Sequence, residues 1–223
     1  MIIPISYWRN QGALPFSAST VSNLRAWYKA DVGITLNVTT VSQWNDQSGG
    51  GNHLIGTSTA QPLYVASSLN GLPTILFDGI NDSLRMASPI TGFTNVTYFI
   101  VIKRNSSALG VSIGGDANNY HYGNDSTTLY SGFNSKAGTT TTSTWYVRSG
   151  TGTGSVATWY SDGVLLTSHS QFGQFNAFQS VGDWNGTYFT SGNIAEVLIY
   201  DKVLNSTERG VVDVYLRAKW ATY

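Results

Sequence analysis

Apolar residues occur along the chain in short runs that are separated by glycine, asparagine and aspartate. Runs of this kind, rich in β-branched and aromatic residues, are typical of β-strands. Strands are predicted at residues 24–30, 41–44, 63–66, 74–77, 84–87, 96–103, 110–113, 120–122, 128–133, 144–148, 155–161, 164–168, 179–184 and 194–200. Their spacing predicts an all-β fold, a two-sheet antiparallel jelly-roll β-sandwich.

Two of these runs are apolar at consecutive positions rather than at alternate ones. They are residues 96–103 and residues 194–200, in which Glu196 is the one acidic residue. A strand of this type is buried on both faces, so both runs are expected inside the fold. The pairs Asn70-Gly71 and Asp162-Gly163 stand between strands and predict tight hairpin turns.

One helix is predicted, near the C-terminal end. Asn205 is a good N-cap, and Glu208 stands three residues later, where the acidic residue of a capping box belongs. Val211, Val212, Tyr215 and Leu216 then recur at helical spacing. The sandwich is therefore expected to end in one short C-terminal helix.

Residues 1–20 form a segment of their own, before the sandwich domain predicted at residues 21–223. Pro4, Gly12 and Pro15 argue against a continuous strand or helix there. The apolar side chains of this segment would be costly to leave in water. Two alternatives follow: a strand packed on the sandwich, or an arm that docks onto a neighbouring subunit or a larger particle.

Four stretches, in order along residues 24–220, resemble the bacterial and phage type of concanavalin A-like (laminin-G-like) lectin domain. They are Leu24-Arg-Ala-Trp-Tyr-Lys-Ala-Asp-Val-Gly, Val41-Ser-Gln-Trp-Asn-Asp-Gln-Ser-Gly-Gly-Gly-Asn-His, Pro73-Thr-Ile-Leu-Phe-Asp-Gly-Ile-Asn-Asp-Ser-Leu, and Gly192-Asn-Ile-Ala-Glu-Val-Leu-Ile-Tyr with the helix after it. The resemblance implies a β-sandwich. It does not fix the function, because this fold hosts lectins, hydrolases and structural modules.

Composition excludes several classes of function. Charged residues are 11% of the chain and the formal net charge is zero, which argues against a nucleic-acid partner. There are no cysteines, so disulfides, thiolate zinc sites and cysteine nucleophiles are excluded. No signal peptide and no membrane-spanning apolar run is recognised, which argues against membrane insertion.

Catalytic motifs are also missing. Glycoside hydrolysis generally needs two carboxyl groups across the bond, but the two glutamates, Glu196 and Glu208, fall in the last strand and the first turn of the helix. His53, His121 and His169 belong to no nucleophile motif. These observations predict that the protein is not an enzyme.

A calcium site is a further hypothesis. Asp78, Asn81 and Asp82 offer three side-chain oxygens within five residues, and calcium prefers oxygen ligands. The alternative is that these residues simply form a β-turn, which uses the same residue types. The resemblance also weighs against calcium, because Ala195 stands where calcium-dependent relatives often carry an aspartate.

Sugar binding needs an aromatic face together with amide, carboxylate or backbone groups. Trp27, Trp44 and Trp159 lie within strand patterns and are expected in the core. Asp183-Trp184-Asn185 places an indole at a turn, so Trp184 and Asn185 are candidate ligand-binding residues. The segment that best fits a sugar site supplies the others: Asp116, Asn118, Asn119, Tyr120, His121, Tyr122 and Asn124.

The sequence thus predicts a non-catalytic carbohydrate-recognition or adhesion module, displayed on a phage virion or another extracellular particle. Its partners would be a cell-surface glycan and neighbouring virion subunits, which residues 1–20 would contact; a homo-oligomer is left open. One alternative is a structural decoration or tail protein that uses a lectin fold without binding sugar. A less favoured alternative is a polysaccharide hydrolase.

Overall fold

The structure is a computed structural model that describes residues 20–115, 120–124, 129–131, 135–136, 141–153, 156–170 and 176–222. The predicted arm, residues 1–20, lies outside these ranges apart from Thr20. The described strands are β1 (Leu24–Lys29), β2 (Ile34–Asn37), β3 (Thr40–Trp44), β4 (Leu54–Ile55), β5 (Leu63–Leu69), β6 (Leu72–Asp78), β7 (Leu84–Thr91), β8 (Val96–Arg104), β9 (Gly110–Gly114), β10 (Tyr120–Asn124), β11 (Leu129–Ser131), β12 (Ser135–Lys136), β13 (Trp145–Gly152), β14 (Val156–Ser161), β15 (Val164–Ser170), β16 (Ala177–Val181) and β17 (Ser191–Tyr200). The described helices are the short 3₁₀ helix η2 (Ser58–Ala60) and the α-helix α2 (Ser206–Trp220).

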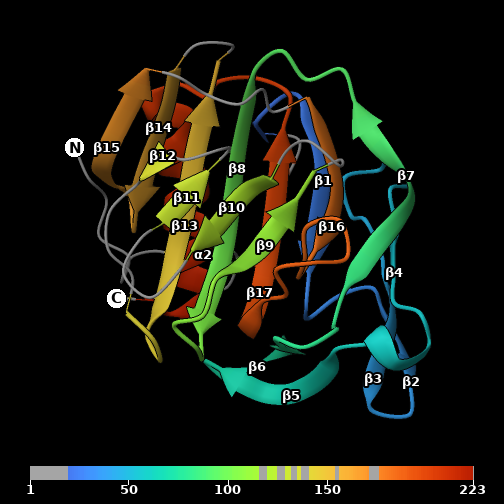
Figure 1. Ribbon diagram of the computed structural model, residues 1–223. Helices are drawn as coiled ribbons and strands as arrows, with labels where there is room; N and C mark the ends of the chain where they lie inside the picture. Colours follow the sequence, from blue (N-terminus) through green and yellow to red (C-terminus); the bar gives the residue numbers. More distant parts are fainter. Residues whose placement is uncertain are drawn as a thin grey trace.

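The strands form two layers, and every pairing between them is antiparallel. The first layer has the order β1, β17, β8, β13, β14, β15. The second has the order β2, β3, β4, β7, β16, β9, β10, β11, β12. Strands β5 and β6 connect the layers, because β6 pairs with the first half of β17 and β5 meets β3. Figure 1 shows the second layer in front of the first, with α2 behind both. The predicted all-β sandwich with one C-terminal helix is confirmed.

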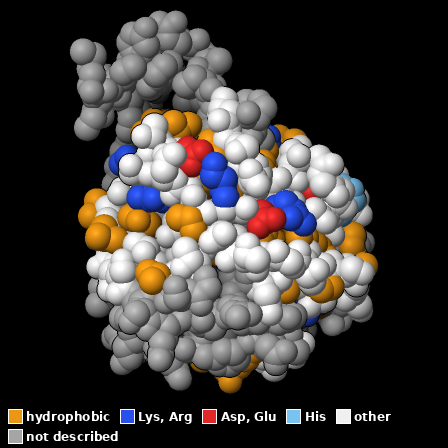
Figure 2. Space-filling model, turned by 90° about the horizontal axis from the view of Figure 1, so that it is seen from above, with side chains coloured by type: hydrophobic (Ala, Val, Ile, Leu, Met, Phe, Trp, Pro, Cys, Tyr) orange, Lys and Arg blue, Asp and Glu red, His pale blue; other side chains and the backbone are white. Residues whose placement is uncertain are grey.

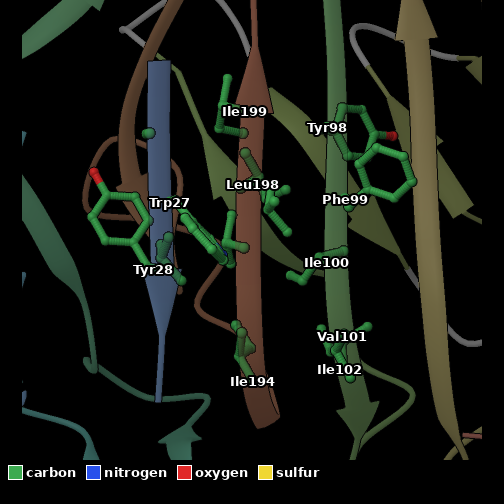
Figure 3. Packing of buried hydrophobic residues seen from close by; sticks show 14 of the residues in the cluster. Trp27, Tyr28, Tyr98, Phe99, Ile100, Val101, Ile102, Ile194, Leu198 and Ile199 are labelled. Atoms are coloured by element: carbon green, nitrogen blue, oxygen red, sulfur yellow. The ribbon is translucent and has the colours of Figure 1, made fainter. Parts of the chain in front are cut away.

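Strands β8 and β17 lie at the centre of the first layer and are buried on both faces, as their continuous apolar runs predict. Successive side chains of a strand point to opposite faces, and Figure 3 shows this for Trp27 and Tyr28 of β1 and for Leu198 and Ile199 of β17. Tyr28 packs toward the second layer, where its ring centroid lies 6.1 Å from that of Phe178. Trp27 packs toward the helix, 6.3 Å from the ring of Tyr215.

Helix α2 begins as its sequence predicts. The Asn205 side chain accepts a hydrogen bond from the Glu208 backbone N–H at 3.0 Å, and the Glu208 carboxylate accepts one from the Asn205 N–H at 3.0 Å. Lys202 donates to the same carboxylate, and this bond is the main reason that the pKa of Glu208 lies below its usual value. Among the described helices, none is long and apolar enough to cross a membrane.

Glu196 connects the helix to the sheet and has no exposure to solvent. Its Oε1 accepts hydrogen bonds from Trp27 Nε1 at 2.6 Å and from the Tyr215 hydroxyl at 2.9 Å. Its Oε2 accepts from Trp220 Nε1 at 2.8 Å and from Lys219 Nζ at 2.9 Å. Burial, together with the charge of Glu196, raises the pKa of Tyr215, so the hydroxyl keeps the proton that it donates. Four donors on one carboxylate join β1, β17 and α2 at a single point.

Local sequence signals fix several turns. Asn70-Gly71 joins β5 to β6 and Asp162-Gly163 joins β14 to β15, and all four residues have positive φ, as a type I′ hairpin turn requires. The three tryptophans expected in the core, Trp27, Trp44 and Trp159, are buried.

Surface charges are neutralised in pairs. Figure 2 shows acidic and basic side chains next to each other on the face seen from above. The described residues contain ion pairs such as Arg25–Asp201 at 2.7 Å and Lys202–Glu208 at 2.7 Å. This distribution agrees with the zero net charge and gives that face no extended field of one sign.

Candidate functional site

An open cleft of about 510 Å³ lies at one end of the second layer. Three separate segments form its walls: β4 with the turn after it, the β6–β7 loop with the start of β7, and the β16–β17 loop. The cleft combines apolar side chains with a small polar group. The residues that matter below are Ile55, Asn81, Ser83, Arg85, Asp183, Gly186 and Phe189.

Arg85 reaches the cleft because of the alternation along β7. Leu84 and Met86 point into the core and are buried, so Arg85 between them faces the other side of the strand. The register places Arg85 opposite Ile55 of β4 on one side and Ser180 of β16 on the other. The guanidinium therefore stands over the outward face of the second layer.

The β16–β17 loop supplies the opposite wall. Trp184 and Thr187 form a two-residue bridge around Asn185 and Gly186, whose φ angles of 49° and 73° define a type I′ turn. The Thr190 N–H donates to the Gly182 carbonyl at 2.7 Å and closes the loop. Asp183 lies between Gly182 and Trp184, and this tight local structure holds it against the sheet.

Asp183 is the carboxyl group that organises the cleft, and it has no exposure to solvent. It forms an ion pair with Arg85, whose side chain is 29% exposed. Its Oδ1 accepts a hydrogen bond from the Ser83 hydroxyl at 2.6 Å, and its Oδ2 accepts one from the Gly186 N–H at 2.6 Å. The buried carboxylate thus fixes Arg85, and its two oxygens accept three hydrogen bonds without any exposure to solvent.

The sequence-predicted ligand residues Trp184 and Asn185 lie beside this cleft. Asn185 is exposed at the turn, and the next residue, Gly186, lines the cleft. Trp184 is half-buried, and its ring stacks on that of Tyr188 with centroids 5.7 Å apart and planes 20° apart. Tyr188 is 46% exposed, so an aromatic pair stands at the surface next to the polar group.

The other predicted sugar-binding segment comes close to the same place through its backbone. Asp116, Asn118 and Asn119 lie outside the described residues. Tyr120, His121, Tyr122 and Asn124 are in β10, but only their backbone is described. Tyr120 pairs with Gly114 of β9, and Gly114 pairs with Ser180 of β16.

Gly114 explains how closely these segments approach. A Cβ atom at this position would lie 2.3 Å from the Asp183 carbonyl oxygen, so the loop can fold onto β9 only because the residue is glycine. The start of β10 is thereby two strands, roughly 10 Å, from the end of β16. Strand β10 also shows register shifts on either side of Tyr122, so strict alternation does not apply to Tyr120 and Tyr122.

The predicted calcium residues form a compact turn between β6 and β7. Asp78 Oδ1 accepts hydrogen bonds from the backbone N–H groups of Ile80, Asn81 and Asp82 at 2.8, 3.2 and 3.4 Å. Asp82 Oδ2 in turn accepts one from the Asp78 N–H at 2.8 Å. Burial, with a smaller effect of the Asp78 charge, raises the pKa of Asp82 to about 6.

This geometry favours the turn alternative for Asp78, Asn81 and Asp82. Among the described residues, no group of three or more His, Cys, Asp or Glu side chains is arranged to hold a metal ion. Calcium binding stays a prediction from the sequence. Asn81 is exposed and lies at the edge of the cleft.

His53 belongs to the loop that resembles the family motif, and its role there is structural. Its Nδ1 accepts a hydrogen bond from the Asp46 N–H at 3.1 Å. Asp46 binds the Trp27 and Ser48 N–H groups at 3.0 and 2.8 Å and the Asn52 N–H at 3.1 Å. This motif therefore stabilises a loop of the sandwich.

Sequence reasoning missed Arg85 and Ser83, and it named Asp183 only as a neighbour of Trp184. One signal was present: Arg85 is a charged residue inside an alternating apolar strand pattern. Its partner could not be found in the same way, because Asp183 lies 98 residues further along the chain.

No family model matches the chain, and no curated protein matches its sequence. Solved structures with the same fold were found. Domain 4 of AbnA, a GH43 extracellular arabinanase from Geobacillus stearothermophilus in complex with arabinotriose, is 17% identical with a TM-score of 0.60, over 86% of this chain and 98% of that domain. Trypanosoma rangeli sialidase in complex with sialic acid is 15% identical with a TM-score of 0.62, over 97% of this chain and 35% of the sialidase. An arabinofuranosidase complexed with arabinofuranosyl-alpha-1,2-xylobiose is 11% identical with a TM-score of 0.61, over 81% of this chain and 51% of that protein.

These likenesses show the fold, which this chain shares with parts of an arabinanase, a sialidase and an arabinofuranosidase. The chain spans nearly all of the arabinanase domain, about a third of the sialidase and about half of the arabinofuranosidase. None of the three is described as a concanavalin A-like or laminin-G-like domain, the family that the sequence resembles.

One sequence prediction is overturned here. The lack of a paired-carboxylate motif predicted a protein that is not an enzyme, but the three solved structures described above, which share its fold, are glycosidases or parts of them. The physical reason is that functional carboxyl groups need not be neighbours in sequence. Asp183 joins the cleft from a different loop than Asn81 and Ser83, and no local motif records such a meeting.

Proposed function

We propose that the chain is a glycan-binding β-sandwich of a carbohydrate-active protein and that the Arg85–Asp183 cleft is its binding site. The observation that supports this most is the combination of apolar walls with a fixed polar group in a cleft of about 510 Å³. Ligand pockets typically measure roughly 300–1,000 Å³ and pair apolar lining with a few well-placed polar groups. A single pyranose with part of its neighbour fits that size.

The two sides of the cleft suit the two kinds of surface on a sugar. Ile55, which is 37% exposed, and the half-buried Phe189 offer apolar contact to the C–H face of the ring. Arg85 and the exposed Asn81 offer hydrogen bonds to its oxygens. The Trp184–Tyr188 stack stands nearby, where it can contact a second sugar residue.

Membership in the concanavalin A-like, laminin-G-like lectin domains is the finer part of the proposal. It is supported by the four sequence motifs and by the two-layer fold. One of those motifs, the loop of Asp46, Ser48, Asn52 and His53, forms a closed hydrogen-bonded structure of the type that a recurring motif would encode.

We also propose display on a phage virion or another extracellular particle, with residues 1–20 contacting neighbouring subunits. The resemblance to phage-type domains supports this placement. Deletion of residues 1–20 should abolish assembly and leave a folded sandwich, which circular dichroism and size-exclusion chromatography of purified particles would detect. If the deletion unfolds the sandwich, these residues are part of the domain, and the docking role is wrong.

Hydrolysis is the second candidate, and the fold shared with glycosidases favours it. Asp183 is the one carboxyl group among the described residues that line the cleft, so a two-carboxylate mechanism would need a second carboxyl group from another part of the protein. Release of reducing sugar from the saccharides used below tests this directly.

Glycan-array binding of the full chain, followed by titration calorimetry of the saccharides found, tests the main proposal. We expect specific binding that Arg85→Gln removes. Arg25→Gln is the matched control, because Arg25 is also a partly exposed arginine in an ion pair, with Asp201, away from the cleft. If the two variants bind glycan equally, or if the folded chain binds none, the cleft is not a glycan site.

A further inference from the structure

The cleft has an unusual balance of hydrogen-bonding groups. A sugar hydroxyl that donates a hydrogen bond needs an acceptor, and carboxylates are the strongest acceptors that proteins offer. Here the carboxylate of Asp183 is buried, accepts hydrogen bonds from Ser83 and Gly186, and forms an ion pair with Arg85. It therefore has no free side to present to a ligand.

The donor side of the cleft is more open. Arg85 is 29% exposed and lines the cleft, and of its five N–H groups Asp183 engages those on Nη2. A guanidinium presents its N–H groups in a planar fork that matches the two oxygens of a carboxylate. The Asn81 amide stands exposed on the same loop as Ser83 and adds another donor.

Two other acidic residues, Asp78 and Asp82, are near in sequence, but neither lines the cleft as an acceptor for a ligand. Their carboxylates accept hydrogen bonds from the backbone of the β6–β7 turn. The polar group that faces the cleft is therefore rich in donors and contains one cation.

We infer that the cleft recognises an acidic sugar, and that Arg85 binds the sugar's carboxylate while Asp183 holds the guanidinium in place. This inference rests on the proposed glycan-binding function and specifies its ligand class. Uronic acids and sialic acids both carry the carboxylate that the geometry requires. Ile55 and Phe189 would contact the ring that bears it.

Asp183 is a positioning residue in this arrangement, and the electrostatics explain why it does not cancel the attraction. Its charge is shared among an ion pair and two neutral donors, whereas the outer edge of Arg85 has solvent in front of it. An incoming carboxylate replaces that solvent. Because the contact is partly exposed, its contribution should weaken as ionic strength rises.

The test is titration calorimetry of the full chain with matched pairs of saccharides. Trigalacturonic acid is compared with its methyl ester, and sialyllactose is compared with lactose, so the two sources of carboxylate are separated. We expect one acidic saccharide to bind at least tenfold more tightly than its neutral partner, with a smaller preference at high salt.

Variants link this preference to Arg85. Arg85→Gln should remove it, and Arg85→Lys, which keeps the charge and can keep an ion pair with Asp183, should retain the fold and lower the preference because it lacks the planar fork. Arg25→Gln should leave it unchanged. Circular dichroism confirms that each variant is folded.

Each remaining outcome has a definite meaning. If acidic and neutral saccharides bind with equal affinity, and Arg85→Lys does not change their ratio, the glycan-binding proposal stands and the acidic-sugar inference is wrong. If the folded chain binds no saccharide on the array or in the calorimeter, both are wrong.

Discussion

Two carboxylates without solvent exposure, Glu196 and Asp183, lie on opposite sides of the sandwich and have similar partners. Each accepts hydrogen bonds from neutral donors and pairs with one cation. The cations differ: the Lys219 side chain is 12% exposed, and the Arg85 side chain is 29% exposed and borders a cleft.

The difference shows how one type of cluster can serve the fold or a ligand. Around Glu196 the neutral donors, Trp27, Tyr215 and Trp220, are buried between helix and sheet, and Lys219 also binds Asp31 at 2.8 Å. Glu196 and its four donors are thus paired with one another inside the protein. Around Asp183, one edge of the Arg85 guanidinium has solvent in front of it. In the proposed function, the partly exposed cation is what distinguishes the Asp183 cluster, as a ligand site, from the Glu196 cluster.

The largest effect is expected from Glu196→Gln. The change puts an amide donor against four donors and leaves Lys219 without its buried counter-charge, so unfolding free energy should fall by about 3 kcal/mol or more. Urea denaturation measures this. The matched control is Glu208→Gln, the same change in a surface capping box, which should cost less than about 1 kcal/mol. Equal losses would mean that the buried network adds nothing special.

Asp183→Asn should have a mixed effect. The amide NH2 would face either the Ser83 hydroxyl, which binds Oδ1, or both Arg85 and the Gly186 N–H, which bind Oδ2, and in both cases Arg85 loses its counter-charge, so we expect a loss of about 1–3 kcal/mol in stability. Saccharide affinity should fall as well, because Arg85 is no longer held in place. The control is Asp201→Asn, which removes the half-exposed partner of Arg25 and should cost less than about 1 kcal/mol. Unchanged affinity in folded Asp183→Asn would separate Asp183 from the binding site.

This comparison also shows what could be predicted from the sequence. The capping box of Asn205 and Glu208 and the turns Asn70-Gly71 and Asp162-Gly163 depend on neighbouring residues, so local patterns reveal them. The two central strands were recognised because burial on both faces leaves a continuous apolar run. The order of strands within each layer could not be derived from these signals.

The candidate site depends on contacts between residues that are far apart in the sequence, and local sequence patterns do not reveal such contacts. Arg85 comes from strand β7 and Asp183 from the β16–β17 loop, and Gly114 matters only because Asp183 folds onto it. Trp184 and Asn185 are predicted ligand residues because an aromatic residue at an Asn-Gly turn is a local signal, and the structure places them beside the cleft. The non-enzymatic prediction failed for the same reason, since it searched for carboxyl groups as neighbours.

Trp184→Ala tests whether the stacked rings of Trp184 and Tyr188 belong to the proposed binding site around Arg85 and Asp183. The ring is half-buried and stacks on the exposed Tyr188, so its removal should reduce saccharide affinity several-fold and leave the melting temperature nearly unchanged. Trp145→Ala is the control, because Trp145 is also half-buried but packs against the core and Lys103. That variant should lose stability and keep its affinity. The reverse pattern would assign Trp184 to the core.

The smallest effect concerns a third acidic residue, Asp82, which is 6% exposed and has no ion pair within the described structure. Burial raises its pKa from 3.8 to about 6, so the folded state binds the proton more tightly than the unfolded state does. Its contribution to stability is therefore full below pH 4 and is lost as pH rises toward 6 and beyond.

Asp82→Asn keeps an acceptor for the Asp78 N–H and removes this loss, so it should match the parent at pH 4 and gain up to about 1 kcal/mol at pH 7.5. Urea denaturation across this range, in the presence of a chelator, measures the difference, and repeating it with calcium chloride tests the predicted calcium site. If the pH profiles of parent and variant are parallel, the lack of a cationic partner does not destabilise ionised Asp82. The difference between the Glu196 and Asp183 clusters would then need another cause than their cationic partners.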